Sequence, residues 1–227
     1  GFTSYSLARL RSQAEGWMDE GFARVKIKVG RDAAADVARM AAVREVIGDD
    51  VRFMVDANGA FEVRRAIAVA CEDYARFGVS WLEEPVSSDD LAGLRRVRDA
   101  VPPAIEVAAG EYVTDVFGFA RMADAVDVLQ ADPTRSGGVT GVLRADALAK
   151  ARCLPLSAHC APAISAHVFA ACETAVHLEY FHDHVRVESL LFDGTLSPAG
   201  GKLIPDAARP GLGIALKRAD ADQFRVK

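Results

Sequence analysis

Short apolar runs alternate along the chain with longer stretches in which apolar residues recur every three or four positions. The short runs are typical of buried β-strands, and the longer stretches are typical of amphipathic helices. The predicted strands are 24–29, 51–56, 79–84, 104–108, 126–132, 154–159 and 175–180. The predicted helices are 6–20, 33–47, 63–77, 89–100, 139–151 and 164–174. Strict alternation of strand and helix predicts an α/β fold with a parallel sheet, either closed into a barrel or doubly wound.

The same alternation predicts the domain organisation. Residues 1–180 carry every predicted strand and should form one (β/α) barrel domain, followed by a C-terminal tail, 181–227. A closed parallel barrel has eight strands, and only seven are visible. Because residues 1–5 lie one helix upstream of the first of these, we expect the first barrel strand to precede residue 1. With 227 residues, 51% of them hydrophobic, the chain can bury one sizeable core.

Composition excludes several classes of partner. The 32 acidic and 27 basic residues are scattered and give a net charge of −5, so a nucleic-acid partner has little electrostatic support. Apolar runs all fall short of the roughly 18 residues that suggest a membrane span. Four cysteines without a CxxC pair favour a reducing compartment over a disulfide framework. We therefore expect a cytoplasmic protein that acts on a small molecule.

Ionisable residues lie at or just after the end of every predicted strand. They are Lys26, Lys28, Asp56, Glu83, Glu111, Asp132, His159 and Glu179. From Lys28 onward, each lies 20–28 residues after the one before it, which is about one strand and one helix. The carboxyl ends of the strands of a barrel meet on one face, and that face carries the active site. The spacing therefore predicts that these residues gather in a single mouth.

Three of these residues are carboxylates on successive strands: Asp56, Glu83 and Glu111. Three acids in one enclosed mouth repel one another unless a cation lies among them. Oxygen ligands of high charge suit Mg²⁺, with Mn²⁺ as the other candidate, better than zinc. The structural alternative is that each acid caps the helix that follows it.

The other residues supply proton-transfer groups. Lys26 and Lys28 should lie on one face of a strand, where mutual repulsion and a nearby metal would lower a lysine pKa toward that of a general base. The alternative is an edge strand with both lysines in solvent. Asp132 should fix the tautomer of His159 and make it a second base, unless that histidine is purely structural. Arg135 would contact a substrate carboxylate or hydroxyl, or form a surface salt bridge.

In combination, these motifs resemble the enolase superfamily, specifically its mandelate racemase-like subgroup. The matching stretches are Lys26-Ile27-Lys28, Val55-Asp56-Ala57-Asn58, Trp81-Leu82-Glu83-Glu84-Pro85, Gly110-Glu111, Asp132-Pro133 followed by Gly137-Gly138-Val139-Thr140-Gly141, Ser157-Ala158-His159 and His177-Leu178-Glu179. The resemblance covers essentially the whole chain. It implies a modified (β/α)7β barrel and an N-terminal capping domain that this sequence does not contain, with the C-terminal tail packed on the barrel or the cap.

The resemblance also implies roles for the residues. Asp56, Glu83 and Glu111 would bind Mg²⁺. Lys28 would be one base, with Lys26 as its electrostatic partner, and His159 with Asp132 would act from the opposite face. Glu179 would hydrogen-bond a substrate carboxylate oxygen, and Asn58 would contact the substrate. Relatives of this kind are commonly homo-oligomers, so a homo-oligomer is expected here.

Several functions fit this set of residues. The favoured one is a lyase that dehydrates a sugar acid to a 2-keto-3-deoxy acid after removing the proton α to its carboxylate. An isomerase that racemises or epimerises a 2-hydroxy acid could use the same residues. A non-catalytic barrel binding protein and a zinc hydrolase are the remaining alternatives, the latter using His182, His184, Cys153 and Cys160.

Overall fold

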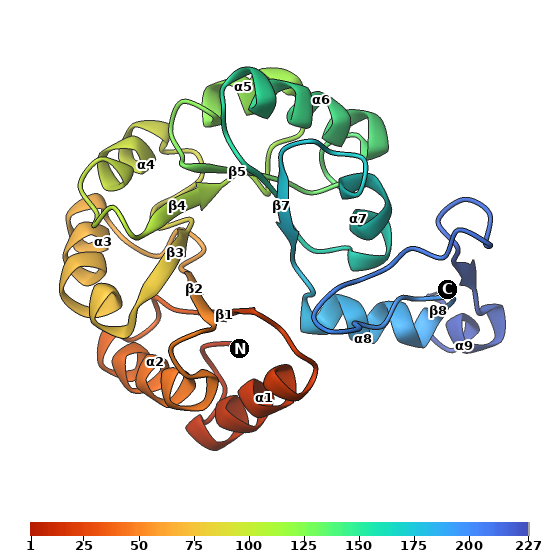
Figure 1. Cartoon of the computed structure of the whole chain (residues 1–227), viewed down its shortest axis with the longest axis horizontal. Coiled ribbons are helices and arrows are strands. Elements are labelled where there is room, and N and C mark those ends of the chain that lie inside the picture. Colours follow the sequence, from red (N-terminus) through yellow and green to blue (C-terminus); the bar gives the residue numbers. More distant parts are fainter. Residues whose placement is uncertain (227) are drawn as a thin grey trace. The chain divides into compact units, whose positions relative to one another are not determined.

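A computed structural model describes residues 1–226 and confirms the predicted α/β fold. Seven parallel strands follow one another in chain order in a single sheet, which is the strand order of a (β/α) barrel (Figure 1). The strands are β1 (Arg24–Lys28), β2 (Arg52–Asp56), β3 (Val79–Glu83), β4 (Glu106–Ala109), β5 (Val128–Ala131), β6 (Leu156–Ala158) and β7 (Ala175–Leu178). All seven predicted strands are present, each shorter at one or both ends than its apolar run.

The helices between the strands also follow the prediction in most places. They are α1 (Leu7–Asp19), α2 (Ala33–Ile47), α3 (Val63–Val69), α4 (Leu91–Arg98), α5 (Val116–Met122), α6 (Gly138–Ala151), α7 (Pro162–Phe169), α8 (His182–Leu191) and α9 (Arg218–Asp222). A short antiparallel pair, β8 (Phe192–Asp193) with β9 (Ala215–Leu216), lies in the C-terminal segment. The residues 1–226 contain no helix long and apolar enough to cross a bilayer.

Two predicted helices end earlier than expected. The stretch 63–77 is an α-helix only to Val69, after which Ala70–Tyr74 forms a π-helical turn and Ala75–Phe77 a 3₁₀ turn. The predicted helix 164–174 begins at Pro162 and stops at Phe169. Helices α5, α8 and α9 are additional to the prediction. Helices α5 and α9 have only seven and five residues, too few for a clear apolar period, and α8 lies in the segment that was expected to be an irregular tail.

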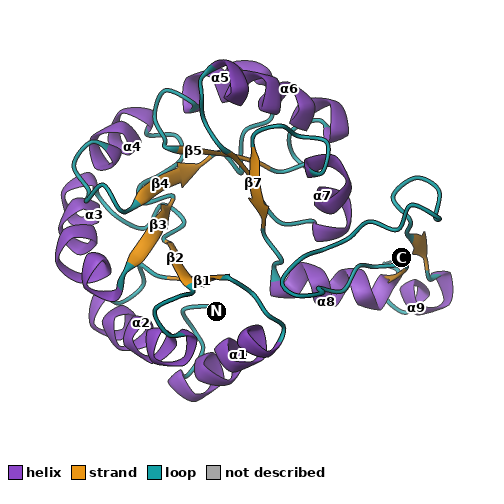
Figure 2. Ribbon diagram, in the orientation of Figure 1, coloured by secondary structure: helices purple, strands orange, loops and turns teal. Residues whose placement is uncertain are grey.

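The chain divides into two compact units. The first comprises Gly1–Ala109 with Ala120–Leu129, and the second comprises Gly110–Phe119 with Gln130–Lys227. The predicted boundary near residue 180, between barrel and tail, stays a prediction. Within the first unit, helices α2, α3 and α4 lie on the same side of strands β1 to β4 (Figure 2). That side buries the apolar alternates of the strands, such as Ile27 and Val55.

On the opposite face of the first unit's strands, apolar side chains form one layer. Met54, Trp81, Ala108 and Val128 form a buried cluster there. Met54 pairs in register with Trp81, and side chains two residues apart on a strand share a face. The next residues on that face are therefore Asp56, beyond Met54, and Glu83, beyond Trp81. The cluster forms an apolar floor beneath these two carboxylates.

In the second unit, Asp146 on α6 holds the segment that follows α7. Its carboxylate accepts hydrogen bonds from the Thr174 hydroxyl at 2.6 Å, the Thr174 amide at 2.9 Å and the Glu173 amide at 3.1 Å. These bonds stop α7 short of Thr174 and lead the chain into β7. Burial alone would raise the pKa of Asp146, but the hydrogen bonds outweigh it and lower the pKa.

Replacing Asp146 with alanine should therefore lower the free energy of unfolding by about 2–4 kcal/mol at neutral pH. Because the folded-state pKa is depressed, this stabilisation is present above the unfolded pKa, about 3.9, and is lost as the pH falls through the folded value. Urea unfolding at pH 7 and at pH 3 measures the difference between wild type and variant. A difference that does not shrink at the lower pH would contradict this role.

Candidate active site

Strand register places three of the predicted residues at one level in the first unit. Lys28 on β1 pairs with Asp56 on β2, and Asp56 pairs with Glu83 on β3. All three are the last residues of their strands. Parallel strands that end together present their final side chains at the same rim. The sequence prediction that these strand ends converge is confirmed for this unit.

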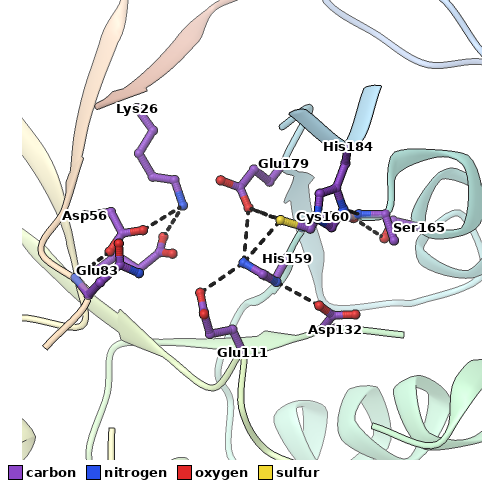
Figure 3. A network of polar contacts seen from close by, with 12 residues as sticks. Lys26, Asp56, Glu83, Glu111, Asp132, His159, Cys160, Ser165, Glu179 and His184 are labelled. Carbon is purple, nitrogen blue, oxygen red and sulfur yellow. Dashed lines mark hydrogen bonds and ion pairs between the residues drawn. The ribbon is translucent and has the colours of Figure 1, made fainter. Parts of the chain in front are cut away.

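Lys26, Lys28, Asp56 and Glu83 form the lysine–carboxylate cluster (Figure 3, in which Lys28 is not labelled). Lys26 Nζ lies 2.6 Å from Glu83 Oε2 and 3.7 Å from Asp56 Oδ2, and Lys28 Nζ contacts Asp56 Oδ2. Trp81 Nε1 donates a further hydrogen bond to Glu83 at 3.0 Å. The carboxylates are fully buried and the lysine side chains are only 14% and 19% exposed. The alternative of a solvated edge strand is therefore wrong.

The helix-cap alternative is also wrong for Asp56 and Glu83. Helix α3 begins after Glu62, and α4 begins after Asp90, which caps it by accepting from the Gly93 amide. Asp56 instead accepts a hydrogen bond from the amide of Asn58 at 2.8 Å. Asn58 has φ of +44° and an exposed side chain. The turn thus holds one oxygen of Asp56 and presents Asn58 to solvent.

The pKa of Lys28 differs from the sequence-based expectation. Burial lowers it and Lys26 lowers it further, but attraction to Asp56 and Glu83 outweighs both and raises it. Repulsion between the lysines is therefore present, as predicted, and is smaller than the effect of the carboxylates.

The second unit holds the other predicted residues. Glu111, Asp132, Arg135, His159 and Glu179 form the histidine cluster (Figure 3, in which Arg135 is not labelled). The His159 amide donates to the Ala131 carbonyl, so His159 follows β6 beside the end of β5, where Asp132 lies. His159 Nδ1 lies 2.8 Å from Asp132 Oδ2. Figure 3 shows Asp132 near one nitrogen of the imidazole, and Glu111 and Glu179 near the other.

Asp132 is itself held by Thr134. The Thr134 hydroxyl and amide both donate to Asp132 Oδ1 at 2.7 Å. Burial would raise the pKa of Asp132, but the hydrogen bonds from His159 and Thr134 lower it. Asp132 therefore stays ionised and accepts a hydrogen bond from the Nδ1–H of His159, which leaves Nε2 facing the rest of the cluster.

His159 Nε2 faces two carboxylates. It lies 3.0 Å from Glu111 Oε2 and 3.7 Å from Glu179 Oε2. Burial lowers the pKa of His159, but its contacts with Asp132, Cys160 and Glu111 raise the pKa to about 12. Three carboxylates therefore surround the His159 imidazole, and its catalytic role stays a prediction.

Arg135 forms ion pairs with two acidic residues of the site. Its guanidinium lies 3.2 Å from Glu111 Oε1 and 3.6 Å from Asp132 Oδ2, and it stacks over the Tyr112 ring at 4.7 Å. The side chain is about one-third exposed. Arg135 thus belongs to the histidine cluster, and its contact with substrate stays a prediction.

Gly110 positions Glu111 by its close approach to β5. It has φ of +136°, and a Cβ at this position would lie 2.3 Å from the Gln130 carbonyl oxygen. Gly110→Ala should therefore destabilise the protein by about 2–4 kcal/mol. Gly16→Ala is the matched control, since no atom lies within 4 Å of its added Cβ in helix α1 and alanine favours a helix. Thermal unfolding of both variants tests this, and equal melting temperatures would contradict it.

Sequence reasoning missed Cys160 as a neighbour of the site. Its thiol lies 3.2 Å from His159 Nε2 and 3.4 Å from Glu179 Oε2, and its amide donates to the same Glu179 oxygen at 3.2 Å. The available signal was its position directly after His159, at the end of a strand. The zinc-hydrolase alternative is not supported, because among residues 1–226 neither Cys153 nor His182 belongs to a group of side chains that could share a metal.

A family model described as "Enolase C-terminal domain-like" matches residues 9–221. The chain belongs to the enolase superfamily. D-galactarolactone cycloisomerase of Agrobacterium fabrum is 35% identical over 226 residues, which cover 91% of this chain and 58% of that protein. The chain spans about 60% of the length of such curated relatives.

Solved structures agree with this membership of the enolase superfamily. A mandelate racemase/muconate lactonizing enzyme-like protein from Rubrobacter xylanophilus is 54% identical with a TM-score of 0.96, over 98% of this chain and 62% of that one. L-talarate dehydratase from Polaromonas sp. JS666, solved with Mg and L-glucarate, is 30% identical with a TM-score of 0.87, over 98% and 61%. Relatives include sugar-acid dehydratases, cycloisomerases and epimerases or racemases, and several solved ones contain magnesium.

Proposed function

We propose that this protein removes the proton α to a carboxylate with Mg²⁺ as its cofactor, and that it dehydrates a sugar acid to a 2-keto-3-deoxy acid. The buried His159–Asp132 pair, with Nδ1 and Oδ2 2.8 Å apart, supports this proposal most strongly. An imidazole whose Nδ1 is held by a carboxylate can give and take a proton at Nε2. The two lysines of the first unit supply the second proton-transfer group.

Asp56, Glu83 and Glu111 would hold the Mg²⁺ ion. All three are buried and offer only oxygen, which is the ligand set of a hard divalent cation. When bound, the ion supplies stabilisation of the negative charge that develops on the substrate carboxylate. Sharing Asp56 and Glu83 with a divalent cation would also weaken the attraction that raises the pKa of Lys28. That favours the neutral amine that a general base requires.

The residues of the chain then divide the reaction between them. The Lys28 amine takes the α-proton, and the electron pair of the broken carbon–hydrogen bond moves toward the substrate carboxylate. Glu179 would form a hydrogen bond with the substrate carboxylate oxygen on which charge grows. The imidazolium of His159 gives its Nε2 proton to the β-hydroxyl as the carbon–oxygen bond breaks, so that water leaves. The resulting enol converts to the 2-keto acid.

Epimerisation is the second candidate, and the presence of two separate proton-transfer groups favours it. If the His159 proton goes to the α-carbon in place of the β-hydroxyl, the acid is released with inverted configuration. The two outcomes share every residue up to that step. Membership of the superfamily is compatible with both, since dehydratases and epimerases occur among the relatives.

Incubation of the protein with Mg²⁺ and a panel of sugar acids in D₂O separates the candidates. Dehydration yields a 2-keto-3-deoxy acid carrying deuterium at C3, seen by a keto-acid assay and by NMR. Recovery of acids with deuterium at C2 and no keto product would contradict dehydration and support epimerisation. If no acid gains deuterium or forms a keto product, proton abstraction itself is contradicted.

A further inference from the structure

Cys160 is a buried thiol that the proposed reaction does not use. It lies directly after His159 with φ of +47° and is 3% exposed. Figure 3 shows its sulfur turned toward the His159 ring and the Glu179 carboxylate. His159 Nε2, Cys160 Sγ and Glu179 Oε2 come from two strand ends and lie close enough to share one ion. We propose that these three residues form a second metal site, which binds a borderline or soft divalent ion such as Zn²⁺ or Cd²⁺.

The distances between the three ligand atoms fit one tetrahedral ion. Nε2 lies 3.2 Å from Sγ, Sγ lies 3.4 Å from Oε2, and Nε2 lies 3.7 Å from Oε2. Tetrahedral zinc, with bonds of about 2.0–2.3 Å, separates its ligands by roughly 3.3–3.6 Å. Shifts of a few tenths of an ångström at the two flexible side chains would therefore complete the geometry.

The surroundings hold the ligands in the orientation that a metal needs. Asp132 binds Nδ1 of His159, and a carboxylate is one of the partners that metal-bound histidines use for their other nitrogen. The Cys160 amide donates to Glu179 Oε2 at 3.2 Å and brings that carboxylate to the thiol. Ser165 Oγ donates to the Cys160 carbonyl at 2.8 Å, and His184 Nδ1 accepts from the Ala161 amide at 3.2 Å. These bonds fix the turn that carries the thiol.

Ligand chemistry distinguishes this site from the magnesium ligands. Mg²⁺ takes oxygen, whereas a set of one nitrogen, one sulfur and one oxygen favours zinc or cadmium over magnesium. Three protein ligands leave a fourth position open to water or a substrate oxygen. An ion here would occupy Nε2 of His159. If the proposed function holds, it would therefore block proton transfer without displacing Mg²⁺.

Cadmium titration of the protein in excess Mg²⁺ tests the site directly. The ultraviolet charge-transfer absorption of a cadmium–thiolate bond should rise to about one equivalent in wild type. It should also do so in Cys153→Ser, a matched control at an exposed thiol. It should be absent in Cys160→Ser and Cys160→Ala, whose folding is checked by circular dichroism. Wild type without the absorption, or a Cys160 variant that keeps it, would overturn the site.

Zinc inhibition provides the functional readout. Turnover at saturating Mg²⁺ should be inhibited by Zn²⁺, and the inhibition constant should weaken at least tenfold in the Cys160 variants, each compared with its own rate without zinc. Inhibition that excess Mg²⁺ reverses equally in wild type and variants would place zinc at the magnesium ligands and overturn the proposed site. If no substrate turns over, the cadmium titration still shows whether the metal site exists. Failure of the proposed function is therefore distinguished from failure of the metal site.

Discussion

Replacing His159 with asparagine should lower kcat by about 10²- to 10⁴-fold, the range for loss of a positioned acid or base. The reason is that the Nε2 proton is lost, while asparagine keeps a polar side chain of similar size in the cluster. His167→Asn on helix α7 is the matched control and should stay within about threefold of wild type, because His167 has no contact with the histidine cluster among the described hydrogen bonds and ion pairs. Steady-state kinetics with the substrate found in the panel measures both.

Asp132 should act only through His159. Asp132→Asn should lower kcat strongly on its own, and the double variant with His159→Asn should be no slower than His159→Asn alone. Residues that work as a unit are non-additive in this way. Additive losses would mean that Asp132 has a separate role, and the assigned proton path would then be wrong.

Replacing Lys28 with methionine should also lower kcat by about 10²- to 10⁴-fold. Methionine fills similar space without the amine. Because the Lys28 ammonium attracts Asp56, its removal should leave Mg²⁺ affinity unchanged or stronger, as measured by calorimetry. Weaker Mg²⁺ binding together with lost turnover would assign Lys28 to support of the metal site in place of proton transfer.

The two base variants should also differ from each other in D₂O. Each should retain exchange of the α-proton only for substrates whose proton faces the remaining base, and Lys150→Met, at an exposed position, should exchange as wild type does. NMR of recovered acids follows the exchange. Identical exchange patterns in Lys28→Met and His159→Asn would contradict bases on opposite faces.

The strand pattern and the strand-end residues could be read from the sequence because both depend on local periodicity. Asp56 and Glu83 end adjacent strands, and parallel register alone brings them to one level. The end of α2 was also predicted from the sequence, because a glycine, Gly48, follows it. Gly48 adopts the positive φ, +67°, that often ends a helix. Such signals lie within a few residues of the feature that they predict.

Features that depend on tertiary contacts could not be read in the same way. The helix expected to reach residue 174 stops at Phe169, since Asp146 on another helix binds the segment beyond it. The raised pKa of Lys28 reflects a balance among four buried charges, and spacing does not give its sign. The Cys160 side chain reaches the site because its backbone is left-handed, with φ of +47°. A non-glycine residue rarely adopts this conformation, so the sequence did not indicate it.

A crystal structure of the protein grown with Mn²⁺ in place of Mg²⁺ tests the proposed metal site most directly. Anomalous scattering locates the manganese without ambiguity. We expect one strong peak within about 2.3 Å of a carboxylate oxygen from each of Asp56, Glu83 and Glu111. A principal peak that lacks any one of these three carboxylates would contradict this expectation.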